Sequence, residues 1–228
     1  MRQESIHYGI QIISRGRFLF LLVSLLLLLL ITPLLEGIVR VRAVVDIFFS
    51  VILLSGTNAV SQQKRGVLIA ALLALPMLLS TWLAYFVNNI YLQLAGTFFG
   101  LLFFGFVIVA ILRFILGQHH ITFDVIFAAI VVYLLLGVLW SLIYSLLELL
   151  HPGSFNYAKG QLQDSRFALV YYSFVTLTTL GYGDFTPATP TAGSLAVMEA
   201  IIGQIYLAVL VATLVGVQIA QSMVDKKK

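Results

Sequence analysis

Long apolar segments, separated by short polar ones, run through most of the sequence. Six of them can be marked, with the bounds Phe18–Leu35, Val44–Asn58, Val67–Val87, Ile90–Leu116, Ile121–Leu150 and Thr191–Val224. Most reach the roughly 20 residues that a helix needs to cross the hydrocarbon core of a bilayer. The second is shorter and ends in polar residues. The pattern therefore predicts helices that span a membrane.

Composition agrees with this pattern. Hydrophobic residues make up 61% of the 228 residues and charged residues only 10%, whereas a soluble domain is about half apolar and roughly a quarter charged. There is no cysteine, which excludes disulfides and thiol metal sites. We find no phosphate loop, metal-ligand cluster or nucleophile with its base. We expect an all-α membrane protein in contact with lipid, not an enzyme, with no cofactor and no nucleic-acid partner.

A shorter stretch lies between the fifth and sixth segments. It predicts a helix over about Arg166–Leu177, which Asp164 or Ser165 can cap. This helix is too short to cross a membrane, so we expect it to be re-entrant. The chain continues as Thr178-Thr179-Leu180-Gly181-Tyr182-Gly183-Asp184. Non-helical backbone at membrane depth is tolerated only inside protein or beside water.

The sequence Thr-Leu-Gly-Tyr-Gly at positions 179–183 resembles the Thr-Val-Gly-Tyr-Gly filter of potassium channels. A dehydrated potassium ion needs a cage of oxygens, which consecutive carbonyls supply if all turn to one side. Gly181 and Gly183 can take the positive φ that such a turn requires. The resemblance implies potassium at the carbonyls of Thr179, Leu180, Gly181 and Tyr182 and at the Thr179 hydroxyl, with the ring of Tyr182 turned away to brace the loop.

The resemblance divides the chain into two parts. Residues 118–228 are similar to a pore domain, with an outer helix, a pore helix, a filter and an inner helix, and residues 1–117 form a four-span bundle in the place of a voltage sensor. In the family a filter needs four strands around one axis. Because the sequence holds one Gly-Tyr-Gly, we expect a homotetramer that conducts potassium passively.

Residues around the filter are candidates for its support. The resemblance implies that the Tyr171 hydroxyl reaches Asp184; the alternative is that Tyr171 and Tyr172 are two interfacial tyrosines. Glu199 is an acid inside the sixth segment, where an ionisable group is costly and often functional. We expect it to bond a pore-helix hydroxyl such as Thr178 or Thr176. The alternative is a structural glutamate with no part in gating.

The sixth segment carries the candidate gate. Gly203 stands where the family often has a hinge glycine, although a glycine also permits close helix packing. Ala208 and Ala212 are expected to line a wide inner vestibule. Before this segment, Phe185–Pro187 is expected to form the turn that leaves the filter, and Thr189 to cap the helix with Pro190 at its first position.

The first four segments lack the charges of a voltage sensor. Each charge that crosses 100 mV contributes about 2.3 kcal/mol, so a sensor needs several. The fourth segment has no arginine before Arg113 at its inner end, which we interpret as an interfacial anchor. We therefore expect gating that arginines do not drive. A voltage-gated channel and a non-conducting regulatory subunit are the alternatives.

Positive charge suggests the orientation. If the termini are cytoplasmic, the inner segments carry nine of the 13 Lys and Arg residues, in accord with the positive-inside rule. We therefore expect a multi-pass protein of the cell membrane with both termini cytoplasmic and the filter outside. Arg15 and Arg17 before the first apolar run are also compatible with a signal peptide, but no suitable cleavage site follows. His119 and His120, between the two halves, form either a pH-sensitive or metal-binding pair or a solvated loop.

Overall fold

The computed structural model describes residues 17–34, 41–59, 64–84, 86–87, 89–118, 122–157 and 165–225. Each of the six apolar segments forms a helix, within a few residues of the expected bounds. In chain order these helices are α2 (Arg17–Leu34), α3 (Val41–Ala59), α4 (Lys64–Leu83), α5 (Ile90–Leu116), α6 (Phe123–Leu150) and α8 (Pro190–Asp225). His119 and His120 lie outside the described residues.

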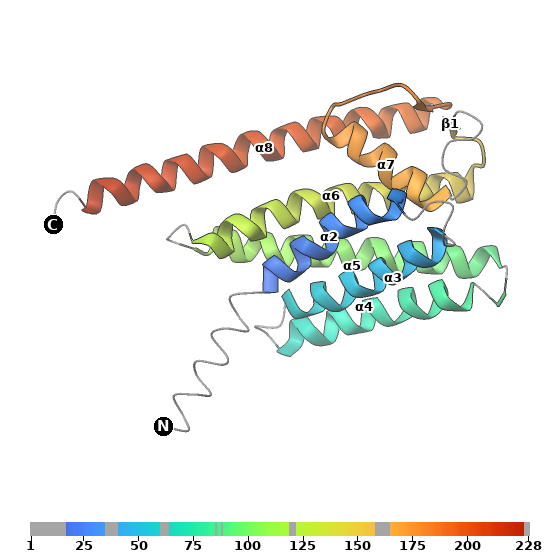
Figure 1. The fold of residues 1–228 in the computed structure, drawn as a ribbon, viewed down its shortest axis with the longest axis horizontal. Coiled ribbons are helices and arrows are strands. Elements are labelled where there is room, and N and C mark those ends of the chain that lie inside the picture. Colours follow the sequence, from blue (N-terminus) through green and yellow to red (C-terminus); the bar gives the residue numbers. More distant parts are fainter. Residues whose placement is uncertain are drawn as a thin grey trace.

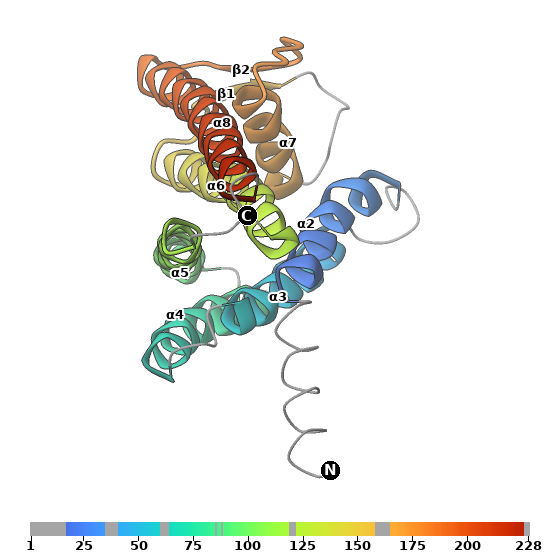
Figure 2. The same ribbon diagram turned by 90° about the vertical axis from the view of Figure 1, so that its left-hand side faces the viewer.

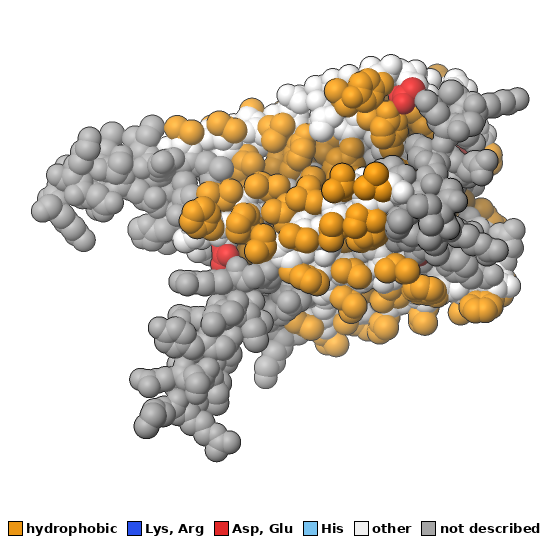
Figure 3. Space-filling model, viewed as in Figure 1, with side chains coloured by type: hydrophobic (Ala, Val, Ile, Leu, Met, Phe, Trp, Pro, Cys, Tyr) orange, Lys and Arg blue, Asp and Glu red, His pale blue; other side chains and the backbone are white. Residues whose placement is uncertain are grey.

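Four helices are long and apolar enough to cross a membrane, by the described residues alone. They are Arg65–Leu83, Ile90–Leu116, Phe123–Leu150 and Pro190–Thr213. The apolar parts of α2 and α3 are shorter, at Phe18–Thr32 and Val45–Thr57. Hydrophobic side chains form a broad band across the face shown in Figure 3. The chain is an all-α membrane protein, as expected, apart from one short ribbon.

Helix α6 lies at the centre of the arrangement. It packs against α5 and α2 on one side and against α7 (Ser165–Leu177) and α8 on the other. Figures 1 and 2 show α8 and α7 together on the side of α6 away from α4. Among the first helices, α2 packs on α3 and α4 packs on α5. Helix α6 therefore contacts both groups of helices, and α3 also contacts α7.

The bounds of α8 follow from local chemistry. The Thr189 hydroxyl accepts a hydrogen bond from the N–H of Ala192 at 3.3 Å, and Pro190 is the first helical residue. A proline is tolerated there because its missing N–H would have no partner inside the helix. This confirms the expected cap.

A two-stranded antiparallel ribbon was not expected. Strand β1 (Phe155–Tyr157) pairs with β2 (Phe185–Pro187), and Asn156 lies opposite Thr186. The expectation of a simple turn over Phe185–Pro187 is therefore wrong. The pairing joins the segment after α6 to the segment after the filter loop, so it ties the exit of the loop to the outer helix.

Candidate functional site: the filter loop and its support

The end of α7 holds the start of the filter loop. The carbonyl of Val175 accepts hydrogen bonds from the N–H groups of Leu180 at 2.9 Å and Gly181 at 3.4 Å. The N–H of Thr179 reaches the carbonyl of Thr176 at 2.9 Å. The first amides of the loop therefore face back toward α7, which leaves the opposite side of the loop for the carbonyl oxygens.

The backbone of the loop alternates in handedness. Thr179 has φ 58°, Gly181 has φ 60° and Gly183 has φ 80°, while Leu180 and Tyr182 between them are not in the positive region. Alternation of this kind turns successive carbonyls to the same side, whereas in an ordinary strand they alternate. The two glycines take these angles without strain.

Thr179 takes the same conformation at a cost. Among the described residues, Thr179 is the only residue other than glycine that has a positive φ. A β-branched residue at positive φ is a genuine outlier, and such strain is of the order of 1–3 kcal/mol. Strained residues cluster at functional sites. The strained residue is thus the one for which the resemblance implies two potassium ligands, the carbonyl oxygen and the hydroxyl oxygen.

The side chains of the loop are open in the single chain. Leu180 is 54% exposed and Tyr182 is 67% exposed. The ring of Tyr182 therefore cannot brace the loop against its own chain, and a neighbouring surface would have to do so. The assignment of Thr179, Leu180, Gly181, Tyr182 and Gly183 as the ion-binding filter stays a prediction that this geometry suits.

Asp184 is held at the mouth of the loop. The half-buried Tyr171 hydroxyl donates a hydrogen bond to Asp184 Oδ2 at 2.7 Å, and the N–H of Phe185 donates to Oδ1 at 3.0 Å. The contact between Tyr171 and Asp184 is the one that the resemblance implied. A tyrosine hydroxyl keeps its proton at neutral pH, so Tyr171 is the donor in this bond.

Tyr172 points to the other side of α7, into an aromatic cluster. Its ring centroid lies 4.9 Å from Phe185, 5.0 Å from Tyr144 and 5.3 Å from Phe155. These tilted and edge-on arrangements are the favourable ones for aromatic pairs. The cluster joins α6, β1, α7 and β2, so Tyr172 packs on the ribbon, and its role in filter support stays a prediction.

Glu199 and Thr178 do not meet. Thr178 donates its hydroxyl to the carbonyl of Phe174 at 2.7 Å, within its own segment. Glu199 is instead bonded to the hydroxyls of Ser173 and Tyr144, and it is fully buried. The expected bond between Glu199 and a hydroxyl of the pore helix α7 is therefore confirmed, although the residue is Ser173 and not one of the two examples, Thr178 and Thr176. The role of Glu199 and Thr178 in filter support stays a prediction.

The hydrogen bonds around Glu199 are all matched if its carboxyl carries a proton. The Ser173 hydroxyl oxygen lies 2.7 Å from the carbonyl oxygen of Gly137 and 2.5 Å from Oε1 of Glu199. A serine hydroxyl has one proton, and a carbonyl can only accept. A single proton shared between two acceptors bonds each of them weakly, whereas a proton on Glu199 gives each contact its own donor. The resulting chain runs from Tyr144 to Glu199, then to Ser173 and to Gly137, with every donor matched to an acceptor.

Two glycines allow close contact with α7. A Cβ added to Gly203 on α8 would lie 2.6 Å from the carbonyl oxygen of Leu177, and one added to Gly137 on α6 would lie 2.7 Å from the ring of Phe174. Real Cβ atoms essentially never approach so closely. Of the two interpretations of Gly203, the structure therefore supports close packing. A hinge at this position stays a prediction.

The rest of α8 is open on much of its surface. Ala208 and Ala212 are exposed, as are Val211 and Val215. Only 11% of the residues in its most apolar window are buried. This exposure suits the expected lining of an inner vestibule.

Three residues of the site, Ser173, Tyr144 and Glu148, were not predicted from the sequence. Ser173 was one hydroxyl of many on the pore helix, and Tyr144 was interpretable as an interfacial ring. Glu148 accepts hydrogen bonds from the N–H groups of Gly153 at 2.8 Å and Ser154 at 3.0 Å, which closes the turn after α6. The one available signal was Gly153 itself, because a Pro-Gly pair marks a turn.

Comparison with known proteins agrees with this geometry. A family model described as "Ion channel" matches residues 121–219, which include α6, the filter loop and most of α8. The protein described as "Two pore potassium channel c" from Oryza sativa subsp. japonica is 38% identical over 65 residues. That match covers 28% of this chain and 14% of the length of the relative. No solved structure matches. Both similarities are to channels rather than to enzymes, and they support an ion channel in a membrane.

Proposed function

We propose that the chain is the subunit of a potassium-selective channel and that four copies form one pore. The observation that carries the proposal is the alternating backbone at Thr179, Gly181 and Gly183. This alternation arranges consecutive carbonyls as a row of oxygen ligands, which can replace the hydration shell of potassium. Ions then flow down their gradient without covalent chemistry.

Four copies are needed because one loop supplies one side of an ion cage. Residues 178–183 of the loop and much of α8 are exposed in the single chain, and both would face the axis or a neighbouring copy. A closed ring of identical subunits covers such surfaces with one repeated contact. The similarity to a potassium channel over 65 residues supports the choice of ion.

We further propose that arginines do not drive the gate. In α5 the basic residue is Arg113, which lies exposed in the last turn. One charge at a helix end moves through little of the membrane field. Gly203, Ala208 and Ala212 on α8 form the proposed gate. With both termini cytoplasmic, the filter lies at the outer side of the cell membrane.

Reconstitution in lipid vesicles tests the proposal. The purified protein should pass potassium in clear preference to sodium, measured as flux and as a reversal potential. Gly181→Ala should abolish the current, because alanine rarely adopts the φ of 60°. Gly105→Ala is the matched control, since a Cβ there meets nothing within 4 Å, and it should conduct normally. Equal permeability to both ions, or selective current in an intact Gly181→Ala tetramer, would overturn the proposal.

A further inference from the structure

The attachment of α8 to the rest of the chain changes along its length. In its first half, Glu199 is bonded to hydroxyls of α6 and α7, and Gly203 lies against the carbonyl of Leu177. Between residues 208 and 216 most of the described side chains are exposed. The boundary between the attached part and the open part lies close to Tyr206.

The Tyr206 hydroxyl joins α8 to α6. It donates a hydrogen bond to the carbonyl of Ala129, which is fully buried on α6, at 2.7 Å. This is the usual length of a well-formed bond between a hydroxyl and an oxygen. The next polar side chain along α8, that of Thr213, donates to the carbonyl of Val209 in its own helix at 2.8 Å. Among the described side chains of α8, Tyr206 is therefore the last one with a hydrogen bond to another helix.

A second tyrosine supports this contact. The rings of Tyr206 and Tyr133 are stacked, with centroids 6.0 Å apart and an interplanar angle of 23°, within the range of favourable aromatic pairs. Tyr133 lies on α6, one turn after Ala129. Its hydroxyl oxygen is 3.4 Å from the carbonyl oxygen of Leu177 at the end of α7, which is long for such a bond. The side chain of Tyr206 is thus held at its ring and at its hydroxyl.

The place of Tyr206 makes its bond sensitive to movement of α8. Tyr206 follows Gly203 by three residues, on the next turn of the helix. A bend at Gly203 that moved the rest of α8 away from α6 would separate the hydroxyl from Ala129. A hydroxyl in an apolar region is costly without a partner, so this separation is opposed until water or another polar group replaces the carbonyl.

We propose that Tyr206 is a positioning residue for the gate. Its bond to Ala129 holds α8 against α6, and loss of the bond lets the part of α8 that follows Gly203 move away from α6. This part includes Ala208 and Ala212, so the bond also sets how often the gate conducts. The last statement rests on the proposed channel function, whereas the contact between the two helices does not.

Two spin labels measure whether α8 leaves α6. The chain has no cysteine, so Phe123→Cys on α6 and Val215→Cys on α8 introduce two labelling sites, at side chains that are 78% and 50% exposed. An excess of unlabelled protein in the vesicles keeps the measured distances within one chain. Double electron–electron resonance gives the distribution of distances between the labels. We expect Tyr206→Phe to raise the population at longer distances at least threefold.

Two further side chains at position 206 separate the hydrogen bond from the packing. Para-aminophenylalanine keeps a donor in the place of the hydroxyl and should restore the native distribution. Para-methylphenylalanine fills the same space without a donor and should behave like Tyr206→Phe. This pair decides the question even if Tyr206→Phe fails to fold. An unchanged distribution in folded Tyr206→Phe, or equal distributions for the two replacements, overturns the proposal.

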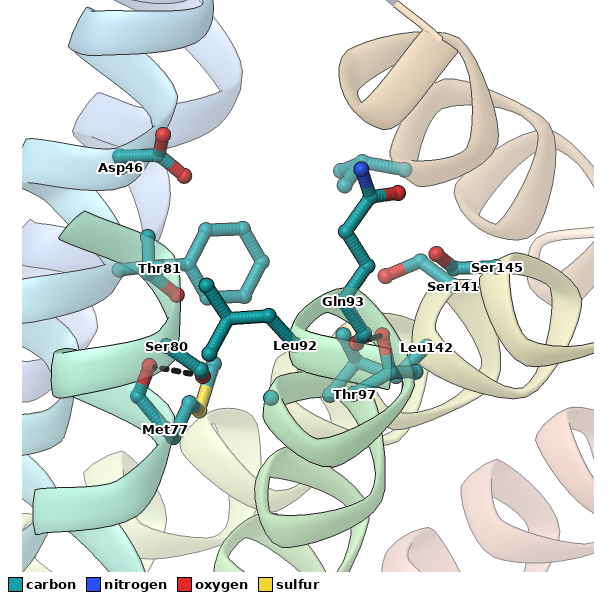
Figure 4. A pocket seen from close by; sticks show the side chains of 13 residues that line it. Asp46, Met77, Ser80, Thr81, Leu92, Gln93, Thr97, Ser141, Leu142 and Ser145 are labelled. Carbon is teal, nitrogen blue, oxygen red and sulfur yellow. Dashed lines mark hydrogen bonds between the residues drawn. The ribbon is translucent and has the colours of Figure 1, made fainter. Parts of the chain in front are cut away.

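A cavity among the other helices provides the matched control. The described residues that line it come from α3, α4, α5, α6 and α7, and Figure 4 shows Thr97 on its wall. Thr97 is buried on α5, where its hydroxyl donates to the carbonyl of Gln93 in the same helix at 2.9 Å. Thr97→Val removes a bond from a hydroxyl to a backbone carbonyl that does not join two helices, so it should leave the distances unchanged. The same change in Thr97→Val as in Tyr206→Phe would mean a general loss of stability and would overturn the role of Tyr206.

Flux in vesicles then tests the link to conduction. Tyr206→Phe should change potassium flux at least threefold and leave the reversal potential between potassium and sodium unchanged, because the filter loop is untouched. An unchanged flux, with the distances as expected, overturns the link to conduction and keeps the contact between α8 and α6. If the native protein carries no potassium flux, the proposed function fails while the distances still decide the role of Tyr206 in holding α8.

Discussion

The hydroxyl oxygen of Ser173 lies 2.5 Å from Oε1 of Glu199, and both side chains are fully buried. This contact joins the pore helix to the inner helix at the level where Ser173 also bonds the outer helix through Gly137. The three elements that surround the filter loop thus share one hydrogen-bonded chain. Changes to that chain should be felt in the stability of the pore half and in conduction.

Glu199→Gln is expected to behave almost like the native protein. The amide N–H₂ can donate to Ser173 and the amide oxygen can accept from Tyr144, so every bond of a protonated Glu199 is kept. Glu199→Ala leaves the buried Tyr144 hydroxyl without its acceptor, which costs about 1–3 kcal/mol, whereas Ser173 keeps its bond to Gly137. Thermal unfolding in detergent and flux in vesicles measure the two effects.

An infrared spectrum provides the control for this prediction. The native protein should show the carbonyl band of a protonated carboxylic acid, and Glu199→Gln should lack that band. A Gln variant as unstable as the Ala variant would mean that the site needs a carboxylate charge, and would overturn the protonated form of Glu199.

Tyr171→Phe should loosen the mouth of the filter. The change removes the 2.7 Å hydrogen bond to Asp184 while the ring keeps its packing. A hydrogen bond to a charged acceptor contributes about 1.5–3 kcal/mol. We expect a less stable pore and faster loss of current during sustained recording. Tyr91→Phe, at a residue that is 77% exposed on α5, should change neither; equal effects from both variants would contradict the assignment of Tyr171.

Gly203→Ala should separate α8 from the end of α7. The new Cβ would lie 2.6 Å from the carbonyl oxygen of Leu177, which is backbone and cannot swing aside. Overpacking of this kind costs about 1–3 kcal/mol. The melting temperature of the protein in detergent should fall, whereas Gly105→Ala should leave it unchanged or raise it, because alanine favours a helix. A stable Gly203→Ala protein would favour a hinge over close packing.

Two substitutions separate the effect of the Thr179 backbone conformation from the effect of its hydroxyl. Thr179→Gly should relieve the strain at φ 58° but lower the preference for potassium over sodium, because the side-chain oxygen is lost. Thr179→Ser keeps that oxygen and should keep selectivity. Reversal potentials with potassium on one side and sodium on the other measure the difference. A glycine variant as selective as the native protein would exclude the hydroxyl as a ligand.

Sequence reasoning succeeded where structure depends on neighbours in the chain. The apolar run from Ile90 to Leu116 has the same bounds as α5. The Thr189 cap was predicted because Pro190 follows it, a common sequence at the start of a helix. The contact of Tyr171 with Asp184 came from a resemblance to a known family. Each of these features spans a short stretch or one recurrent motif.

It failed where structure depends on how distant helices are rotated against one another. The register between α8 and α7 decides which hydroxyl Glu199 meets, so the kind of partner was predicted but Ser173 was not among the examples, Thr178 and Thr176. The β1–β2 pairing joins residues on either side of the pore helix through strands of three residues each, too short for an alternating pattern to be recognised. Contacts between segments that are distant in the sequence cannot be predicted from local sequence patterns.

The uncovered surface of α8 has a consequence for how the protein reaches its working state. A helix that buries so little of itself against its own chain receives most of its neighbours from lipid or from other copies. If those neighbours are other copies, the stability of the pore depends on the density of subunits in the bilayer, as it does for other obligate assemblies. Dilution with lipid would then lower the fraction of intact pores without altering any residue, and synthesis rate would set the threshold at which conduction begins.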